Sequence, residues 1–223
     1  MSLILNIDTA TETAQVNFAR DGIVLQSLQN VSQKDHASFV QVAIQQLLQS
    51  AALSLNDVDA IAVTAGPGSY TGLRVGMSSA KGLCYALNKP LIALNTLEVL
   101  TVAAIQEINV ATSILYCPMI DARRMEVFTA LYTQTLTSAL QPCAMVLNED
   151  SFTDQLQQNP IVFFGSGAAK WQAVCKHSNA SFAVVSNVIN AMAHLSDNYF
   201  QKQAFANLAY TEPFYLKEFQ DKI

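Results

Sequence analysis

The amino-acid sequence predicts an α/β protein of two duplicated lobes, each with a mixed sheet flanked by helices. Short apolar runs of strand length alternate with longer segments whose apolar residues recur at helical spacing, as in a sheet covered by helices. A strand that ends in aspartate, turns tightly and returns is present twice, at Asp8 and again at Asp121. The 223 residues suffice for two lobes of about 100 residues each.

The first predicted lobe, residues 1–109, begins with an antiparallel meander in which Asp21-Gly22 is a typical hairpin turn. Asp35 precedes a helical apolar pattern and is expected to be its N-cap. Strands and helices then alternate, which predicts that the later strands are parallel. The predicted strands are Ser2–Ile7, Thr13–Arg20, Ile23–Leu28, Val58–Thr64 and Pro90–Leu94, and the predicted helices are Asp35–Leu53, Thr71–Leu87 and Thr96–Ile108.

The second predicted lobe, residues 110–223, repeats the strand, aspartate and turn of the first. No low-complexity linker separates the two, so we expect a tight hinge near residues 109–112. The last helix, residues 188–208, is long enough to pack back on the first lobe. The predicted strands are Ile114–Ile120, Glu126–Tyr132, Ala144–Leu147, Ile161–Phe164 and Phe182–Val185, and the predicted helices are Asp150–Gln157, Ala168–His177 and Val188–Leu208.

Composition excludes several classes of function. Charged residues make up only 13% of the chain against a usual share of roughly 25%, so we expect a partner to cover part of the surface. A net charge of −5 argues against independent affinity for a phosphate backbone. The four cysteines form no Cys-x-x-Cys pair, which predicts reduced, buried thiols. Without a signal peptide or the ~18 apolar residues of a membrane helix, we expect a cytoplasmic protein with no membrane contact.

Two turns carry residues suited to phosphate or to a hydrated cation. Asp8 can orient a hydrated cation, and a small hydroxyl residue such as Thr9 lets backbone N–H groups approach phosphate oxygens. Asp121 holds the equivalent place in the second lobe, and Gly165 and Gly167 form a later turn. A structural alternative stays open for each, since Asp8 and Thr9 can satisfy their own turn and the two glycines can simply open a helix.

Standard catalytic and metal motifs are missing. The loop Gly66–Gly72 has the spacing Gly-x-Gly-x-x-x-Gly, which matches neither the dinucleotide fingerprint nor a P-loop, so a sharp structural turn is favoured over phosphate binding. His36 is followed four residues later by Val40, whereas two histidines at that spacing would share one helical face as metal ligands. Ser166 lacks the Gly-x-Ser-x-Gly elbow of a nucleophile. We therefore assign no metal ligand and no catalytic residue.

Three small residues recur every four positions in the helix that follows this loop, and so lie on one face of it. Glycine in a helix interior costs about 1 kcal/mol relative to alanine, so a close contact must compensate. That contact lies either inside the chain or at a subunit interface. We expect an interface, in which Gly76→Leu weakens association and leaves the chain folded. Its predicted residues are Gly72, Leu73, Gly76, Met77, Ala80 and Leu83.

A further set of motifs is spread along nearly the whole chain. The longest runs from Ala65 to Gly76, followed by Ala80–Leu83 and Asn95–Glu98. Shorter ones are Ile7–Ala10, Asp35-His36, Ile120–Arg123 with Glu126-Val127, Phe164–Gly167 and Pro213–Leu216. Together they resemble the TsaB/YeaZ family of tRNA threonylcarbamoyladenosine biosynthesis proteins. Met125 departs from the pattern, because many relatives have glycine or another small or polar residue there.

The resemblance implies an actin-like ATPase fold (ASKHA, ribonuclease H-like) and a part in modifying the adenosine next to the anticodon of tRNAs that read codons beginning with A. In that family's system a paralogue, TsaD, transfers the threonylcarbamoyl group and carries a His-x-x-x-His metal site, of which only His36 is present here. The resemblance thus implies a non-catalytic scaffold that dimerises with and activates a TsaD-type subunit. It implies no cofactor of its own.

The same resemblance implies further partners. These are a TsaE-type ATPase, a second copy of the chain in isolation, ATP or ADP at the complex interface, and tRNA only through the complex. Two other functions stay open. A weak ATPase or small-molecule kinase of the same superfamily would contact nucleotide through the Asp8, Asp121 and Gly165–Gly167 turns, and a metallopeptidase would need a metal site that the sequence does not contain.

Overall fold

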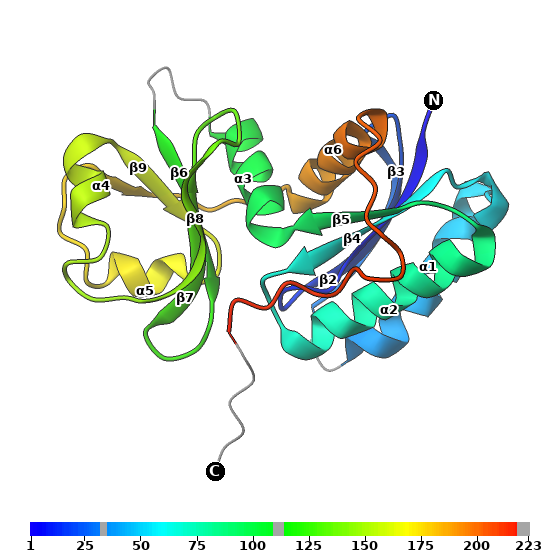
Figure 1. Ribbon diagram of the computed structural model, residues 1–223, viewed down its shortest axis with the longest axis horizontal. Coiled ribbons are helices and arrows are strands. Elements are labelled where there is room, and N and C mark those ends of the chain that lie inside the picture. Colours follow the sequence, from blue (N-terminus) through cyan, green and yellow to red (C-terminus); the bar gives the residue numbers. More distant parts are fainter. Residues whose placement is uncertain (32–34, 109–113, 218–223) are drawn as a thin grey trace, which may run out of the picture. The chain divides into compact units, whose positions relative to one another are not determined.

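The computed structural model describes residues 1–31, 35–108 and 114–217. The chain divides into two compact units, visible in Figure 1. Unit 1 comprises Met1–Val99 and Val188–Phe214, and unit 2 comprises Leu100–Asn187 and Tyr215–Ile223. The division therefore falls at Val99, earlier than the lobe boundary predicted at residue 109, and the C-terminal helix belongs to unit 1. The hinge predicted near residues 109–112 lies outside the described residues.

Unit 1 contains a five-stranded mixed sheet in the order β3-β2-β1-β4-β5. The first three strands pair antiparallel, and β4 and β5 add parallel strands, as the sequence predicts. The hairpin turn at Asp21-Gly22 is confirmed, because both residues have the positive φ that such turns require. The strands are β1 (Leu3–Asp8), β2 (Ala14–Arg20), β3 (Ile23–Asn30), β4 (Ala60–Gly66) and β5 (Leu91–Asn95).

Helices cover both faces of this sheet (Figure 1). Helices α1 (His36–Ala51) and α2 (Tyr70–Leu87) pack side by side on one face, and α6 (Val188–Gln201) packs on the other, against β1, β2, β3 and β5. Asp35 occupies the N-cap position of α1, but its side chain makes no capping hydrogen bond. Helix α6 ends before the predicted Leu208, because Gln203 adopts a left-handed φ of 53°. A short 3-10 helix, η2, spans Leu55–Asp57.

Unit 2 contains a second five-stranded sheet, in the order β10-β9-β6-β7-β8. When β6 is matched with β1, the strand order and directions repeat those of unit 1, which confirms the predicted duplication. The helix predicted to reach His177 is shorter, since the chain turns where the Trp171 carbonyl accepts two successive N–H groups. Helix α3 (Thr96–Glu107) begins in unit 1 and continues in unit 2, because the division falls between Val99 and Leu100. The other elements of unit 2 are β6 (Leu115–Asp121), β7 (Glu126–Tyr132), β8 (Ser138–Val146), α4 (Thr153–Gln158), β9 (Ile161–Phe164), α5 (Ala168–Gln172) and β10 (Ala180–Phe182).

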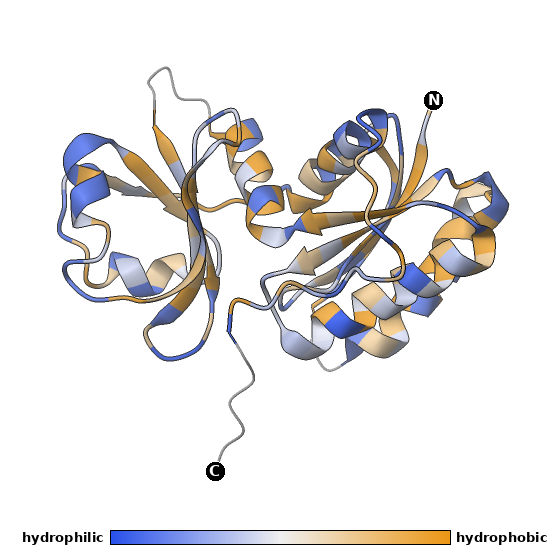
Figure 2. Cartoon of the chain, in the orientation of Figure 1, coloured by the Kyte–Doolittle hydropathy of each residue, from blue (hydrophilic) through white to orange (hydrophobic). Residues whose placement is uncertain are grey.

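Each unit has its own apolar core, and Figure 2 shows hydrophobic residues concentrated along the strands. In unit 2 the rings of Phe152, Phe163 and Trp171 contact one another in edge-to-face and tilted arrangements, with centroids 5.3–6.0 Å apart. All four cysteines are free; Cys84 and Cys117 are buried as predicted, whereas Cys143 and Cys175 are only half-buried, so the prediction of buried thiols is wrong for these two. Across the described ranges, none of the helices has both the length and the apolar character to span a bilayer.

Candidate functional site

The first strand of unit 1 ends at a buried and fully paired aspartate. Asp8 is 2% exposed, and its carboxylate accepts hydrogen bonds from the Ala10 amide (2.9 Å), the Thr64 hydroxyl (2.7 Å) and the Gln15 side-chain amide (3.1 Å). Strand pairing supplies these donors, because Gln15 lies opposite Asp8 on β2 and Thr64 lies on the adjacent strand β4. Burial raises the pKa of Asp8 although these hydrogen bonds oppose the shift.

The next residue, Thr9, is buried against helix α2. Its hydroxyl donates a hydrogen bond of 2.7 Å to the Gly72 carbonyl. A Cβ atom at Gly72 would overlap the Thr9 carbonyl, and one at Gly76 would overlap the Thr9 hydroxyl and crowd Val63. Helix α2 therefore needs glycine at both positions in order to lie on the end of β1. Neither Asp8 nor Thr9 reaches solvent, so neither is available to a nucleotide or a cation in this structure.

The close contact that compensates for the small residues of α2 thus lies inside the chain. The expectation that this stripe forms a subunit interface is wrong, because its face is covered by the sheet of unit 1. Of the six residues predicted for that interface, Gly72, Leu73, Gly76, Met77 and Ala80 are buried within the unit and Leu83 is half-buried.

The opposite side of α1 and α2 faces solvent and is nearly free of charge. No residue of α1 between Ala37 and Ser50 is charged, and Val42 on its solvent side is 52% exposed. On α2 the Arg74 guanidinium lies 4.1 Å from the centroid of the Tyr70 ring, and Tyr85 is 84% exposed. A groove of about 480 Å³ runs along this surface. Its lining residues are Ala37, Tyr70, Thr71, Arg74, Val75, Ser78 and Ser79.

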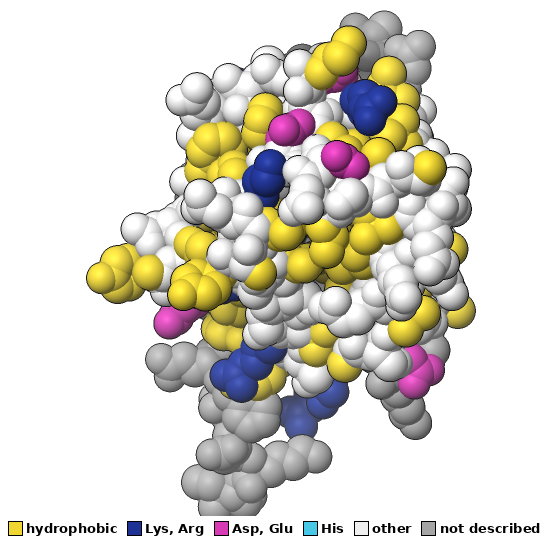
Figure 3. Space-filling view, turned by 90° about the vertical axis from the view of Figure 1, so that its right-hand side faces the viewer, with side chains coloured by type: hydrophobic (Ala, Val, Ile, Leu, Met, Phe, Trp, Pro, Cys, Tyr) yellow, Lys and Arg dark blue, Asp and Glu magenta, His cyan; other side chains and the backbone are white. Residues whose placement is uncertain are grey.

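We call this surface the α1–α2 face. Figure 3 looks onto the right-hand side of Figure 1, where hydrophobic side chains are prominent and charged side chains are few and scattered. Depletion of charge, together with exposed tyrosine and arginine, distinguishes the core of a protein interface from ordinary surface.

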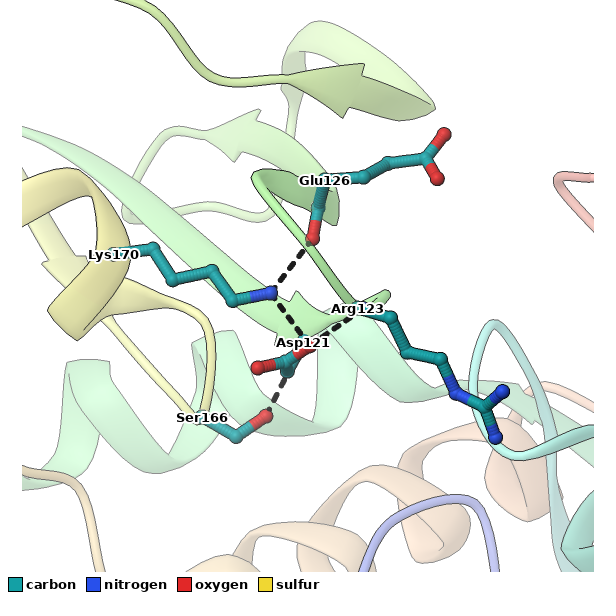
Figure 4. A network of polar contacts seen from close by, with 5 residues as sticks. All are labelled: Asp121, Arg123, Glu126, Ser166 and Lys170. Atoms are coloured by element: carbon teal, nitrogen blue, oxygen red, sulfur yellow. Dashed lines mark hydrogen bonds and ion pairs between the residues drawn. The ribbon is translucent and has the colours of Figure 1, made fainter.

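The aspartate turn of unit 2 has a different environment (Figure 4). The Asp121 carboxylate accepts hydrogen bonds from the Lys170 ammonium (2.7 Å) and the Arg123 amide (2.6 Å), and its own amide donates to the Ser166 hydroxyl (3.0 Å). Lys170 also donates to the Glu126 carbonyl at 3.3 Å. Partial burial raises the pKa of Asp121, but the hydrogen bonds and the Lys170 charge outweigh it and hold this pKa below its usual value.

Gly165 and Gly167 build the turn that carries Ser166. Gly165 has a φ of 96° and packs on the Met119 backbone, and a Cβ at Gly167 would lie 2.7 Å from Val127 Cγ1. The Gly167 amide also donates to the Met119 carbonyl at 2.9 Å. Both glycines are thus required by packing, which favours the structural alternative. The side chains that remain accessible around them belong to Asp121, Ser166 and Lys170, of which the sequence predicted only Asp121.

The histidine at the start of α1 is also buried and makes its contact within the chain. His36 is 3% exposed, and its Nε2 lies 3.2 Å from the Glu12 carbonyl oxygen. Val40, one turn later, belongs to the apolar core of unit 1. Within residues 1–31, 35–108 and 114–217, no three His, Cys, Asp or Glu side chains are grouped so that they could hold a metal ion.

Sequence reasoning missed Lys170, Ser166 and Gln15 as partners of the two aspartates. The signal for Gln15 was present, because pairing the first two strands across their turn places it opposite Asp8. Lys170 lies 49 residues from Asp121 and only the packing of α5 on β6 brings them together, so no local pattern indicates that pair.

The two repeated sheets, each with an aspartate at the end of its first strand, define a protein of the actin-like ATPase fold. Among solved structures of this class, an inorganic polyphosphate/ATP-glucomannokinase from Arthrobacter sp. strain KM superimposes with a TM-score of 0.53 at 9% identity, covering 90% of this chain and 100% of that one. A structure of YeaZ from Pseudomonas aeruginosa gives a TM-score of 0.75 at 25% identity, covering 97% and 100%.

Sequence comparison identifies the family within this class. The family model TsaD, described as tRNA N6-adenosine threonylcarbamoyltransferase, matches residues 24–222. The TsaB protein of Bacillus subtilis (strain 168) is 31% identical over 73% of this chain and 70% of its own length. That of Escherichia coli (strain K12) is 29% identical over 96% and 94%. Both are named tRNA threonylcarbamoyladenosine biosynthesis protein TsaB. The chain belongs to this family, as a member of its TsaB/YeaZ group.

Proposed function

We propose that the chain is a non-catalytic scaffold subunit in the biosynthesis of threonylcarbamoyladenosine on tRNA. In this proposal it acts in the cytoplasm, where it dimerises with a TsaD-type catalytic subunit and activates it for threonylcarbamoyl transfer to the adenosine next to the anticodon. Membership of the family supports the pathway. The single observation that carries the role of a binding subunit is the α1–α2 face.

This face has the composition of an interface and lacks the groups of an active site. Bringing an uncharged surface against a partner avoids the desolvation penalty that charged side chains impose. Tyr85 and the Tyr70–Arg74 pair supply the residue types that most often dominate binding energy. Two helices lying side by side can pack on two helices of a partner, with Val42 and Tyr85 among the buried contacts.

The surroundings of the two aspartate turns support a role without chemistry. In unit 1 the side chains suited to a cation or phosphate are buried and bonded within the chain. In unit 2 the Asp121 carboxylate is occupied by Lys170. We further propose that a TsaE-type ATPase joins the complex, that ATP or ADP binds at its interface, and that the isolated chain forms a homodimer through the same α1–α2 face.

The test is a substitution that charges this face. We expect Val42→Arg to abolish a one-to-one complex with the TsaD-type subunit of the same cell, measured by size-exclusion chromatography with light scattering. Val184→Arg is the matched control, because Val184 is 92% exposed and belongs to unit 2. Threonylcarbamoyladenosine should form on tRNA when the adenylate intermediate, catalytic subunit and unchanged chain are combined, and not with the chain alone.

Two results would overturn the proposal. Modification of tRNA by the chain alone would make it an enzyme, and an unchanged complex with Val42→Arg would remove the α1–α2 face from the interface. The contacts among Asp121, Ser166 and Lys170, of which Asp121 and Ser166 are exposed and Lys170 is half-buried, support one alternative, a weak ATPase or small-molecule kinase. Phosphate release from ATP and Mg²⁺ faster than about 1 s⁻¹, the low end of ordinary enzymes, would favour that alternative.

A further inference from the structure

Two consecutive arginines form the tip of the β6–β7 hairpin in a backbone conformation that arginine rarely adopts. Arg123 has a φ of 71° and Arg124 a φ of 48°. Positive φ is uncommon for residues other than glycine, asparagine, aspartate and histidine, because the Cβ approaches the following carbonyl oxygen. Strain of this kind persists where the surrounding structure holds it, and is concentrated at functional sites.

Another hairpin of the chain has residues that adopt positive φ with less strain. Between β2 and β3, two successive residues also have positive φ, and they are Asp21 and Gly22. These are residue types that such turns favour. The β6–β7 turn has arginines at the two equivalent positions. These arginines are therefore explained by what their side chains do and not by the conformation of the turn.

Contacts within the described part of the chain hold the backbone of this tip, and none of them pairs either of its two guanidinium groups. The Arg123 amide donates to Asp121, and the Glu126 amide donates to the Arg123 carbonyl at 3.0 Å. Among the described residues, the neighbouring lysines are neutralised by the pairs Lys170–Asp121 and Lys217–Glu126, and neither arginine has an ion-pair partner. Figure 4 shows the Arg123 side chain directed away from the Asp121–Lys170 pair.

We propose that this tip, Ala122–Met125, contacts the phosphate backbone of tRNA in the complex with the catalytic subunit; the proposal rests on the proposed function. Guanidinium groups bind phosphate oxygens through two parallel hydrogen bonds. Both arginines are exposed at the turn of a hairpin, which suits a phosphodiester chain better than a mononucleotide, whose base requires a concave apolar pocket. Two contacts in a chain of net charge −5 add to tRNA affinity without creating it alone.

The experiment measures the affinity of the assembled complex for an unmodified tRNA transcript over a range of salt concentrations. The variant is Arg123→Gln with Arg124→Gln. Loss of two phosphate contacts should weaken binding roughly tenfold or more at about 0.1 M salt, and should reduce the slope of log affinity against log salt by about 1.5. Lysine at both positions should keep the slope, and Arg20→Gln, at an exposed arginine of unit 1, should change neither quantity.

A second variant separates binding from turn structure. Arg123→Asn with Arg124→Gly relieves the positive φ, so it should melt at or above the temperature of the unchanged chain while binding tRNA as weakly as the glutamine variant. A glutamine variant that assembles with the catalytic subunit and keeps the slope of log affinity for tRNA against log salt would overturn the inference. The proposed function would still stand. Weaker binding of ATP with unchanged tRNA binding would assign the tip to a nucleotide instead and also overturn it. Failure of the unchanged chain to assemble with the catalytic subunit would overturn both proposals.

Discussion

The two aspartate turns occupy equivalent places in two sheets of the same strand order, yet their surroundings are opposite. Asp8 is buried and its pKa is raised, whereas Asp121 is exposed and its pKa is lowered. The helix that follows the neighbouring strand causes the difference. Helix α2 has 18 residues and packs its small residues on Thr9, whereas α5 has five residues and brings Lys170 to Asp121. A repeated sheet therefore determines where the aspartate lies, and the adjacent helix determines whether solvent reaches it.

The largest effect should come from separating α2 from the turn of unit 1. We expect Gly72→Ala to lower the free energy of unfolding by about 3 kcal/mol, because the new methyl group overlaps the Thr9 carbonyl. Neither group can move away without a shift of the backbone. Urea denaturation measures the change. Gly82→Ala is the matched control in the same helix, since no atom lies within 4 Å of its added Cβ, and it should stabilise by up to about 1 kcal/mol.

The same geometry reverses the expectation for Gly76→Leu. A branched side chain there would enter the space of Thr9 and Val63, so the isolated chain should be destabilised instead of remaining intact. Equal stability of Gly72→Ala and Gly82→Ala would contradict the close packing of α2, and with it the explanation for the difference between the two turns.

A smaller effect is expected from removing each carboxylate. Asp8→Ala leaves the Thr64 hydroxyl and the Gln15 amide as buried donors without an acceptor, which should cost about 2 kcal/mol. Asp121→Ala breaks a partly exposed pair with Lys170 and should cost less than about 1 kcal/mol. Both variants are compared by denaturation in one buffer, and a larger cost at Asp121 would show that exposure does not separate the two turns.

Much of the fold could be predicted from the sequence. Apolar alternation and the Asp21-Gly22 turn locate the meander, and the repeated strand and aspartate indicate the duplication that the two sheets confirm. The ends of α5 and α6 could not be placed, because the turn after Trp171 and the left-handed Gln203 have no glycine or proline to mark them.

Less of the candidate site than of the fold could be predicted from the sequence. The pattern at Gly72, Gly76 and Ala80 indicated a close contact correctly, but periodicity is the same whether the opposing surface is a sheet of the chain or a helix of a partner. Only the packing of the stripe on Thr9 and Val63 distinguishes them. The α1–α2 face could not be located either, since the absence of charged residues between Ala37 and Ser50 becomes informative only when one knows that this side faces solvent.

The most direct comparison of the two turns is the dependence of stability on pH. The folded pKa of Asp8 lies above its ordinary value of 3.8, so between these two values the folded chain binds more protons than the unfolded chain. Its contribution is present below pH 3.8 and is lost as the pH rises through the folded pKa. The folded pKa of Asp121 lies below 3.8, so its contribution is present above that pH and is lost as the pH falls through the folded pKa.

Replacing each aspartate by asparagine should therefore remove contributions of opposite sign. The difference in unfolding free energy between the unchanged chain and Asp8→Asn should decrease as the pH rises above 3.8, and the difference for Asp121→Asn should decrease as the pH falls below it. Urea denaturation at several pH values between roughly 3 and 7 measures both. If the two differences change in the same direction, the aspartates share one environment in solution; opposite directions mean that α2 and α5 give one repeated turn two different protonation equilibria.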